Sequence, residues 1–283
     1  MINEIVNLFN MGDASREIAK IQLEHRLKLI NFWGIASGSR VLEIGCGQGD
    51  TTIALAFTVG EDGFVYGVDI APDSYGSPET LGEARQRIKN SSIGDRLEMK
   101  FNFDVLDDKV SFEKNQFDYV ILSHCLWYFS SKDMLKSIIE RIKDWGEKIC
   151  IAEWNPDITL PEQLPHYKAA TIQAICESYK HSSQSNIRTM FYPNDIRNIL
   201  LSCGIDIIKE GDVYSPNMQD CEWEVSMTLN LYPEEICSLN HMPHNLKGLL
   251  LSQINELKGV TSIKPMASFC LLGIHSKNHT EMS

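Results

Sequence analysis

The sequence predicts an α/β protein built on a doubly wound, mostly parallel sheet. Short apolar runs alternate with helix-compatible runs five times between residues 40 and 154, a pattern typical of parallel strands joined by crossover helices. The first predicted strand, 40–44, runs directly into glycines at alternate positions, 45, 47 and 49. A second apolar strand ends in Asp69, and a third, near 97–101, alternates cleanly between apolar and polar residues.

The composition excludes several classes of function. The chain has 283 residues, 43% of them hydrophobic and 23% charged, as in ordinary globular proteins. Its net charge of −12 argues against a broad nucleic-acid surface. Its eight cysteines lack paired spacing, so neither a metal site nor a disulfide framework is predicted. No signal peptide and no apolar run of roughly 18 residues is visible, so we expect a cytoplasmic protein without stable membrane association.

The first half of the chain gives the clearest elements. Apolar residues at helical spacing predict a helix over 14–33, with Asp13 as its cap. A helix over 50–59 follows the glycines, and the chain then reaches the strand that ends at Asp69. The run Ser77-Pro78-Glu79 predicts a further helix that begins there, with serine as cap and proline at its first position.

The second half keeps the sheet pattern but interrupts it twice. Predicted strands are 117–122, 148–153, 205–213 and 267–275, and predicted helices are 131–144, 162–180, 193–203, 219–231 and 244–257. The regular alternation lapses over 155–192 and again over 215–262, where helical spacing and aromatic residues persist. We expect these two segments to be helical insertions that cover the carboxyl edge of the sheet.

The stretch Glu43-Ile44-Gly45-Cys46-Gly47-Gln48-Gly49 decides which ligand the glycines suit. A dinucleotide site needs a small sixth residue beside the pyrophosphate, whereas Asp50 occupies that position. The stretch resembles the E/D-x-G-x-G-x-G motif of class I S-adenosylmethionine-dependent methyltransferases, and Phe117-Asp118-Tyr119-Val120 resembles that family's F-D-x-V pattern. The resemblance covers residues 35–154 well, 193–213 and 267–276 weakly, and the insertions not at all.

The resemblance implies a fold, a domain plan and a cofactor. It implies a seven-stranded Rossmann-like sheet with an antiparallel last strand, in a single domain over 1–283 with its cofactor-binding core at 35–154. In this family the helix within residues 1–34 often covers the cofactor cleft. Asp69, at the end of the strand next to the first, is expected to accept the ribose hydroxyls. The expected contacts to S-adenosyl-L-methionine are Glu43, Gly45, Cys46, Gly47, Gly49, Asp69, Ile70, Asn102, Asp104 and Ser123.

The segment after the fourth strand supplies the candidates for the acceptor side. His124 is a candidate general base, because only histidine has an unperturbed pKa near neutrality. Candidate contacts to a small-molecule acceptor are Trp127, Tyr128, Trp154 and Trp223, with His166, Tyr192 and Glu153 as weaker candidates. Each of these has a structural alternative, which is packing beneath the insertions or, for His124, a hydrogen-bonded wall.

Several alternatives stay open. A non-catalytic protein that binds the same cofactor, or a cyclopropane-forming enzyme acting on lipid acyl chains, would share this half of the sequence. Base-methylating enzymes of DNA and RNA usually carry [DNS]-P-P-[YFW] after the fourth strand, and residues 123–126 do not match it. The identity of the acceptor, the atom that is methylated and the oligomeric state, with a homodimer among the options, are not fixed by the sequence.

Overall fold

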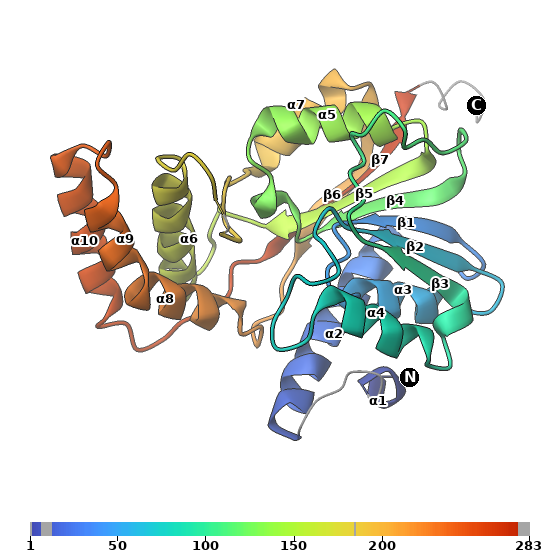
Figure 1. Ribbon diagram of the computed structural model, residues 1–283, viewed down its shortest axis with the longest axis horizontal. Helices are drawn as coiled ribbons and strands as arrows, with labels where there is room; N and C mark the ends of the chain where they lie inside the picture. Colours follow the sequence, from blue (N-terminus) through green and yellow to red (C-terminus); the bar gives the residue numbers. More distant parts are fainter. Residues whose placement is uncertain (1, 7–12, 184, 277–283) are drawn as a thin grey trace.

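The centre of the protein is a seven-stranded sheet with the strand order β3-β2-β1-β4-β5-β7-β6 (Figure 1). The computed structural model describes residues 2–6, 13–183 and 185–276. The strands are β1 (Arg40–Ile44), β2 (Phe64–Val68), β3 (Leu97–Lys100), β4 (Phe117–Ser123), β5 (Gly146–Trp154), β6 (Ile205–Val213) and β7 (Ser268–His275). Strands β1 to β5 pair in parallel, whereas β7 is antiparallel to both of its neighbours. The predicted sheet with an antiparallel last strand is therefore confirmed.

Helices cover both faces of this sheet. The α-helices are α1 (Ile2–Val6), α2 (Asp13–Trp33), α3 (Asp50–Val59), α4 (Leu81–Lys89), α5 (Lys132–Ile142), α6 (Leu164–Glu177), α7 (Pro193–Ser202), α8 (Asp220–Asn230), α9 (Tyr232–Ser238) and α10 (His244–Leu257). Figure 1 shows α5 and α7 above the sheet and α2, α3 and α4 below it. Side chains alternate between these layers along β4: Val120 and Leu122 join one core, and Tyr119 and Ile121 the other. This burial on both faces explains the apolar strands that the sequence contains.

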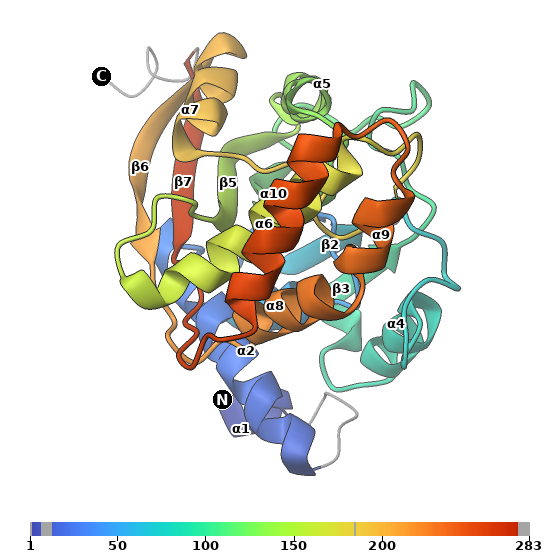
Figure 2. The ribbon, with the colours of Figure 1, turned by 90° about the vertical axis from the view of Figure 1, so that its left-hand side faces the viewer.

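The insertion helices form a third layer with a core of its own. Ile172 and Cys176 of α6 cluster there with apolar residues of α9 and α10, such as Ile236 and Leu250. Figure 1 shows α6, α8, α9 and α10 gathered to the left of the sheet, and Figure 2 looks directly onto this layer. His166 of α6 packs on Trp154, the last residue of β5, with ring centroids 5.2 Å apart. The insertions therefore lie over the edge at which the parallel strands end.

Two local predictions were wrong. Helix α4 begins at Leu81 and not at Pro78, because Thr80 and Glu83 form a capping box whose side-chain and backbone groups bond reciprocally. The second insertion contains an additional helix, α9, which begins next to Pro233 and was not predicted. Among the described residues, no helix combines the length and the apolar character needed to cross a bilayer.

Candidate active site

The glycine loop connects β1 to α3, and its three glycines adopt backbone conformations that favour glycine. The φ angles of Gly45, Gly47 and Gly49 are 76°, 52° and 88°, all in the left-handed region. A Cβ atom on Gly45 would approach Cys125 Cβ to 2.7 Å, and one on Gly49 would approach Ile88 Cδ1 to 2.8 Å. A Cβ atom on Gly47 would meet nothing within 4 Å. Gly45 and Gly49 are therefore needed for packing, whereas Gly47 borders open space where a ligand can approach the backbone.

Asp69 links this loop to the end of β2. Its Oδ2 accepts a hydrogen bond from the Gly47 amide, and its Oδ1 accepts one from the Ala71 amide, each at 2.9 Å. The carboxylate thus lies beside the open position of the loop, as the strand order predicts. The neighbouring Ile70 is 60% exposed, so the same edge also presents an apolar surface. A carboxylate next to an apolar patch matches the needs of a ribose next to a purine.

Glu43 lies inside the protein and does not face the open side of the loop. Its side chain is buried, and Thr52 of α3 donates a hydrogen bond to Oε2 at 2.6 Å. Burial raises the pKa of Glu43 to about 8, so the carboxyl is mainly protonated at neutral pH. Glu43 therefore supports the strand–loop–helix unit from within.

The loop after β3 is joined to the Asp69 segment by its backbone. The Asn102 amide donates to the Ala71 carbonyl at 3.0 Å, and the Phe103 amide donates to the Asp69 carbonyl at 2.9 Å. Asn102 and Asp104 are both exposed, and the Asp104 side chain accepts a hydrogen bond from the Leu106 amide. The Asp104 side chain is thus engaged within its own turn, so Asn102 is the better placed of the two to contact a cofactor.

His124 follows β4 at a left-handed φ of 51°, and both of its ring nitrogens face protein atoms. Its Nε2 lies 3.0 Å from Nε2 of His25 and 3.2 Å from the Ser268 hydroxyl. Its Nδ1 lies 3.4 Å from Oε1 of Glu153. A base role for His124 would therefore require the ring to turn from this arrangement, and that role stays a prediction.

His25 is a member of this cluster that the sequence analysis missed. It lies on α2, it is buried, and its Nδ1 is 3.0 Å from the Ser215 hydroxyl. Burial, together with nearby His124 and the cations Arg26 and Lys28, lowers the pKa of His25 well below its ordinary value. A signal was available, since His25 is two helical turns from Ile18 and one turn from the partly buried Ile21 on the face of α2 that packs inward.

Helix α2 crosses the site and contacts two separate elements there. Arg26 Nη2 forms an ion pair with Asp50 Oδ2 at 3.2 Å, at the start of the helix that follows the glycine loop. One turn earlier, Gln22 Nε2 donates to Asp220 Oδ2 of α8 at 2.7 Å. The first predicted helix thus bridges the glycine-loop side and the insertion side of the site.

Comparison with known proteins agrees with this geometry. The family described as methyltransferase domain matches residues 35–216, which is more than half of the chain. The chain belongs to the class I S-adenosylmethionine-dependent methyltransferases. The glycine loop and strands β1 to β6 of this methyltransferase lie within the matched residues, whereas β7 lies beyond them.

Three relatives of this methyltransferase illustrate the range of the similarity. A crystal structure of a cyclopropane-fatty-acyl-phospholipid synthase-like protein from Lactobacillus casei is 30% identical, with a TM-score of 0.87 over 96% of this chain and 98% of that one. A demethylmenaquinone methyltransferase from Oceanobacillus iheyensis is 23% identical over 72% of this chain and 85% of its own length. Another, from Bacillus mycoides, is 30% identical over 46% of this chain, and the match spans only 52% of that relative.

The predicted acceptor contacts of the methyltransferase divide into a buried group and an exposed group. Trp127, Trp154 and His166 are buried and pack together, with ring centroids 5.2 to 6.2 Å apart between His166 and the two tryptophans. The exposed fractions of Tyr128, Tyr192 and Trp223 are 40%, 38% and 50%. Only the exposed group presents side-chain surface to a ligand in this arrangement, so the buried group serves mainly to support it.

Tyr128 lies where the cofactor half and the insertions meet. Burial raises the pKa of its hydroxyl, and Tyr75, Glu224, Glu153 and Asp69 raise it further through their charges. These four groups come from the loop after β2, from α8, from β5 and from the end of β2. Sequence reasoning missed Tyr75 and Glu224, which lie in segments with no motif. Tyr192 lies apart from them, with its hydroxyl 3.1 Å from that of Tyr167.

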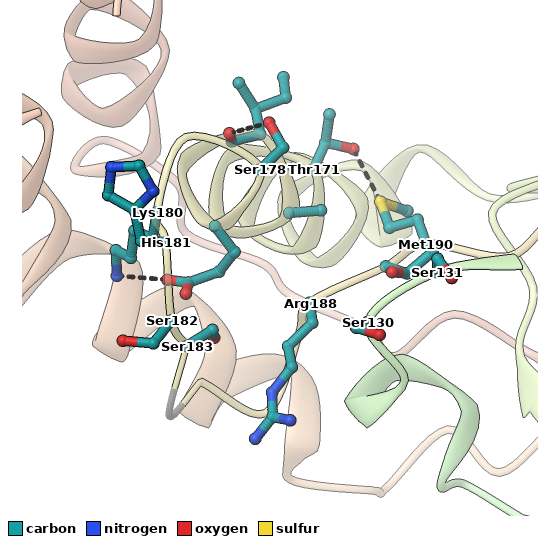
Figure 3. Close-up of a pocket in the computed structure, with 14 residues that line it drawn as sticks. Ser130, Ser131, Thr171, Ser178, Lys180, His181, Ser182, Ser183, Arg188 and Met190 are labelled. Atoms are coloured by element: carbon teal, nitrogen blue, oxygen red, sulfur yellow. Dashed lines mark hydrogen bonds and ion pairs between the residues drawn. The ribbon is translucent and has the colours of Figure 1, made fainter. Parts of the chain in front are cut away.

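A separate cavity of about 730 Å³ lies between α6, the segment 178–190 and the start of α5 (Figure 3). Hydroxyl groups of residues such as Ser130, Thr171 and Ser183 line it, together with Arg188 and Lys180. None of the predicted cofactor residues is among its lining residues. This cavity is therefore distinct from the open side of the glycine loop.

Proposed function

We propose that this methyltransferase transfers the methyl group of S-adenosylmethionine to a small-molecule acceptor. The acceptor would lie between the carboxyl edge of the sheet and the insertion helices α6 and α8. The observation that carries the proposal is the open space at Gly47 beside the Asp69 carboxylate and the exposed Ile70. At Gly47 a ligand can come close to uncharged backbone beside a carboxylate, and this suits an adenosyl ligand that has no phosphates.

The residues of the loop fit this cofactor. Asp69 would accept the ribose hydroxyls, Ile70 would contact the adenine face, and Asn102 or Asp104 would bond its amino group. Gly45, Cys46, Gly47 and Gly49 would present backbone, with Glu43 as their internal support and Ser123 at the end of β4. The Ser123 hydroxyl supports this assignment, because it is buried and has no hydrogen-bond partner among the described residues.

When bound, S-adenosylmethionine supplies a methyl group that is already activated by a sulfonium cation. The task of the protein is therefore to hold the acceptor in line, and orientation of this kind can contribute about 7–11 kcal/mol. Tyr128 and Trp223, which are exposed, are suited to hold a flat or cationic acceptor. His124 would act as a base only for an acceptor that starts protonated, after its ring has turned away from His25.

The charge of the cleft supports a cationic donor and disfavours an anionic acceptor. Besides burial, the charges of Glu224, Glu153 and Asp69 raise the pKa of the Tyr128 hydroxyl, so three carboxyl groups from different elements act on this side chain. Arg26 of α2 is paired with Asp50. An acceptor that is neutral or positively charged therefore suits this cleft best.

The experiment is incubation of the purified protein with methyl-labelled S-adenosylmethionine and defined acceptors. A reduced naphthoquinone, a small primary amine and vesicles of unsaturated phosphatidylglycerol cover the chemistries that the relatives suggest. We expect label in a small molecule, with S-adenosylhomocysteine formed in equal amount. Tight binding of the donor without transfer to any acceptor, a cell extract included, would instead identify a non-catalytic cofactor-binding protein.

A second candidate is a cyclopropane-forming enzyme that acts on lipid acyl chains. It is favoured by the similarity to the Lactobacillus casei protein, whose description names a synthase of this type. Label recovered in a cyclopropane ring of the vesicle lipids, and not in the amine or the quinol, would select this candidate.

A further inference from the structure

A hydrogen-bonded chain runs from helix α2 to the end of β4 and reaches His124. We propose that His25 is a positioning residue that fixes both the orientation of the His124 ring and the nitrogen that carries its proton. The hydrogen-bond chain does not depend on the proposed function. Only its consequence, an effect on the acceptor beside the His124 ring, rests on that function. The chain itself is defined by distances between Lys28, Ser215, His25, His124 and Glu153.

The first two residues, Lys28 and Ser215, set the donor-to-acceptor direction of the hydrogen bonds. Lys28 Nζ lies 3.2 Å from the Ser215 hydroxyl oxygen, and an ammonium group can only donate. The Ser215 oxygen accepts from Lys28, and the Ser215 hydroxyl has no hydrogen-bond acceptor other than His25 Nδ1, 3.0 Å away, among the described residues, so we assign its proton to that bond. His25 Nδ1 is consequently the acceptor nitrogen of that ring.

The direction then passes from one histidine to the other. Because burial lowers the pKa of His25, the ring is neutral and carries a single proton, which must lie on Nε2. His25 Nε2 lies 3.0 Å from His124 Nε2, so the latter nitrogen accepts. The Ser268 hydroxyl lies 3.2 Å from the same nitrogen and 3.3 Å from His25 Nε2, so it can accept from His25 and donate to His124, which gives the same direction. His124 then carries its proton on Nδ1.

Glu153 gives independent support from the other side of the ring. Its carboxyl oxygens accept hydrogen bonds from the backbone amides of Leu126, Trp127 and Trp154, so this group is held as an acceptor. Its Oε1 is 3.4 Å from His124 Nδ1. This contact is not a hydrogen bond, so its effect is an electrostatic preference: a proton on Nδ1 faces the oxygen favourably, whereas the other tautomer would place a lone pair against it. The contact thus favours the tautomer that the hydrogen bond from His25 selects.

The consequence is that α2 controls what His124 presents to the acceptor. With His25 in place, Nε2 of His124 is hydrogen-bonded, Nδ1 lies 3.4 Å from Glu153 Oε1 without forming a hydrogen bond, and the ring lies beside Trp154 at a centroid distance of 4.7 Å. Without His25, Nε2 loses its donor on α2 and the ring gains freedom to turn. The N-terminal helix therefore contributes directly to the geometry of the transfer site and does more than cover it.

The test is nitrogen NMR of the full chain labelled with ¹⁵N-histidine, which distinguishes a protonated ring nitrogen from an unprotonated one. We expect wild-type His124 to show one neutral tautomer with the proton on Nδ1. His25→Ala should lose this single-tautomer pattern. His25→Gln should restore it, because the glutamine amide can donate from the place of Nε2. His244→Ala, a change at an exposed histidine of α10, should leave the pattern unchanged.

Two results would overturn the proposal: a proton on Nε2 of His124 in the wild type, or an unchanged His124 pattern in folded His25→Ala. If His25→Ala does not fold, Ser215→Ala serves instead, because it removes the donor to Nδ1 and should make the His124 pattern heterogeneous. An unchanged pattern in Ser215→Ala would equally contradict the chain. Titration of the same samples with S-adenosylhomocysteine tests the proposed function separately, since a lack of binding would leave the tautomer result intact.

Discussion

Replacing Glu43 by glutamine should change how the stability of the protein depends on pH. The folded state raises the pKa of this carboxyl from about 4.5 to about 8, chiefly because the side chain is buried. The folded protein therefore binds more protons than the unfolded chain between these two values, and its free energy of unfolding falls as the pH rises. The full difference between the two pKa values of Glu43 corresponds to about 5 kcal/mol of unfolding free energy, at about 1.4 kcal/mol per pKa unit. Glutamine keeps an acceptor for the Thr52 hydroxyl but does not ionise.

The assay is urea unfolding of both proteins at several values between about pH 5 and 8, which spans most of the titration. Subtracting the free energy of unfolding of one protein from that of the other, at each pH, removes the contribution of the titratable groups that both proteins contain. The wild type should lose several kcal/mol relative to Glu43→Gln across this range, and Glu147→Gln, a change at an exposed strand residue, should track the wild type. Parallel curves for Glu43→Gln and wild type would show that Glu43 is ionised in the folded state and that its internal role is misassigned.

Three further changes probe the loop and the acceptor side. Asp69→Ala should weaken S-adenosylhomocysteine binding at least tenfold in calorimetry, because charge-assisted hydrogen bonds contribute about 1.5–3 kcal/mol each; unchanged affinity would remove Asp69 from the ribose site. Gly49→Ala should lower the free energy of unfolding by roughly 1–3 kcal/mol, since the residue has a φ of 88° and no room for a Cβ, whereas Gly248→Ala, with open space around it, should not. His124→Ala should lower turnover while leaving S-adenosylhomocysteine affinity unchanged. If His124 is a base, the wild-type rate rises with pH on the acidic side of the pH–rate profile; loss of that rise in the variant would assign a base role, and an unaltered profile an orienting role.

The sheet was predictable because its signals are local. Strands 40–44 and 205–213 were predicted at the bounds that the structure has, since each is a short run closed by glycine or a polar turn. The position of Asp69 beside the glycine loop followed from the parallel order of neighbouring strands. By contrast, the start of α4 was wrong because Ser77-Pro78 and Thr80 offer competing caps, and only the latter also has a glutamate at the third helical position.

The acceptor side was less predictable because its contacts are remote in sequence. His25 meets His124 across 99 positions, Ser215 across 190 and Ser268 across 243. No spacing rule connects such residues: the family resemblance linked the helix within residues 1–34 to the cofactor cleft, but no motif singled out His25. The aromatic residues show the same limit: the sequence does not reveal that Trp154 is buried while Trp223 is exposed. Burial of this kind depends on how the insertions pack on the sheet edge.

Calorimetric titration measures whether the glycine loop and Asp69 form a site for S-adenosylmethionine. S-adenosylmethionine and S-adenosylhomocysteine should bind to the wild type with micromolar dissociation constants, and NAD and ATP should give no heat, because Asp50 follows the last glycine where a diphosphate would need a small residue. Tight binding of NAD, with no heat from either adenosyl ligand, would show that the loop is not an S-adenosylmethionine site.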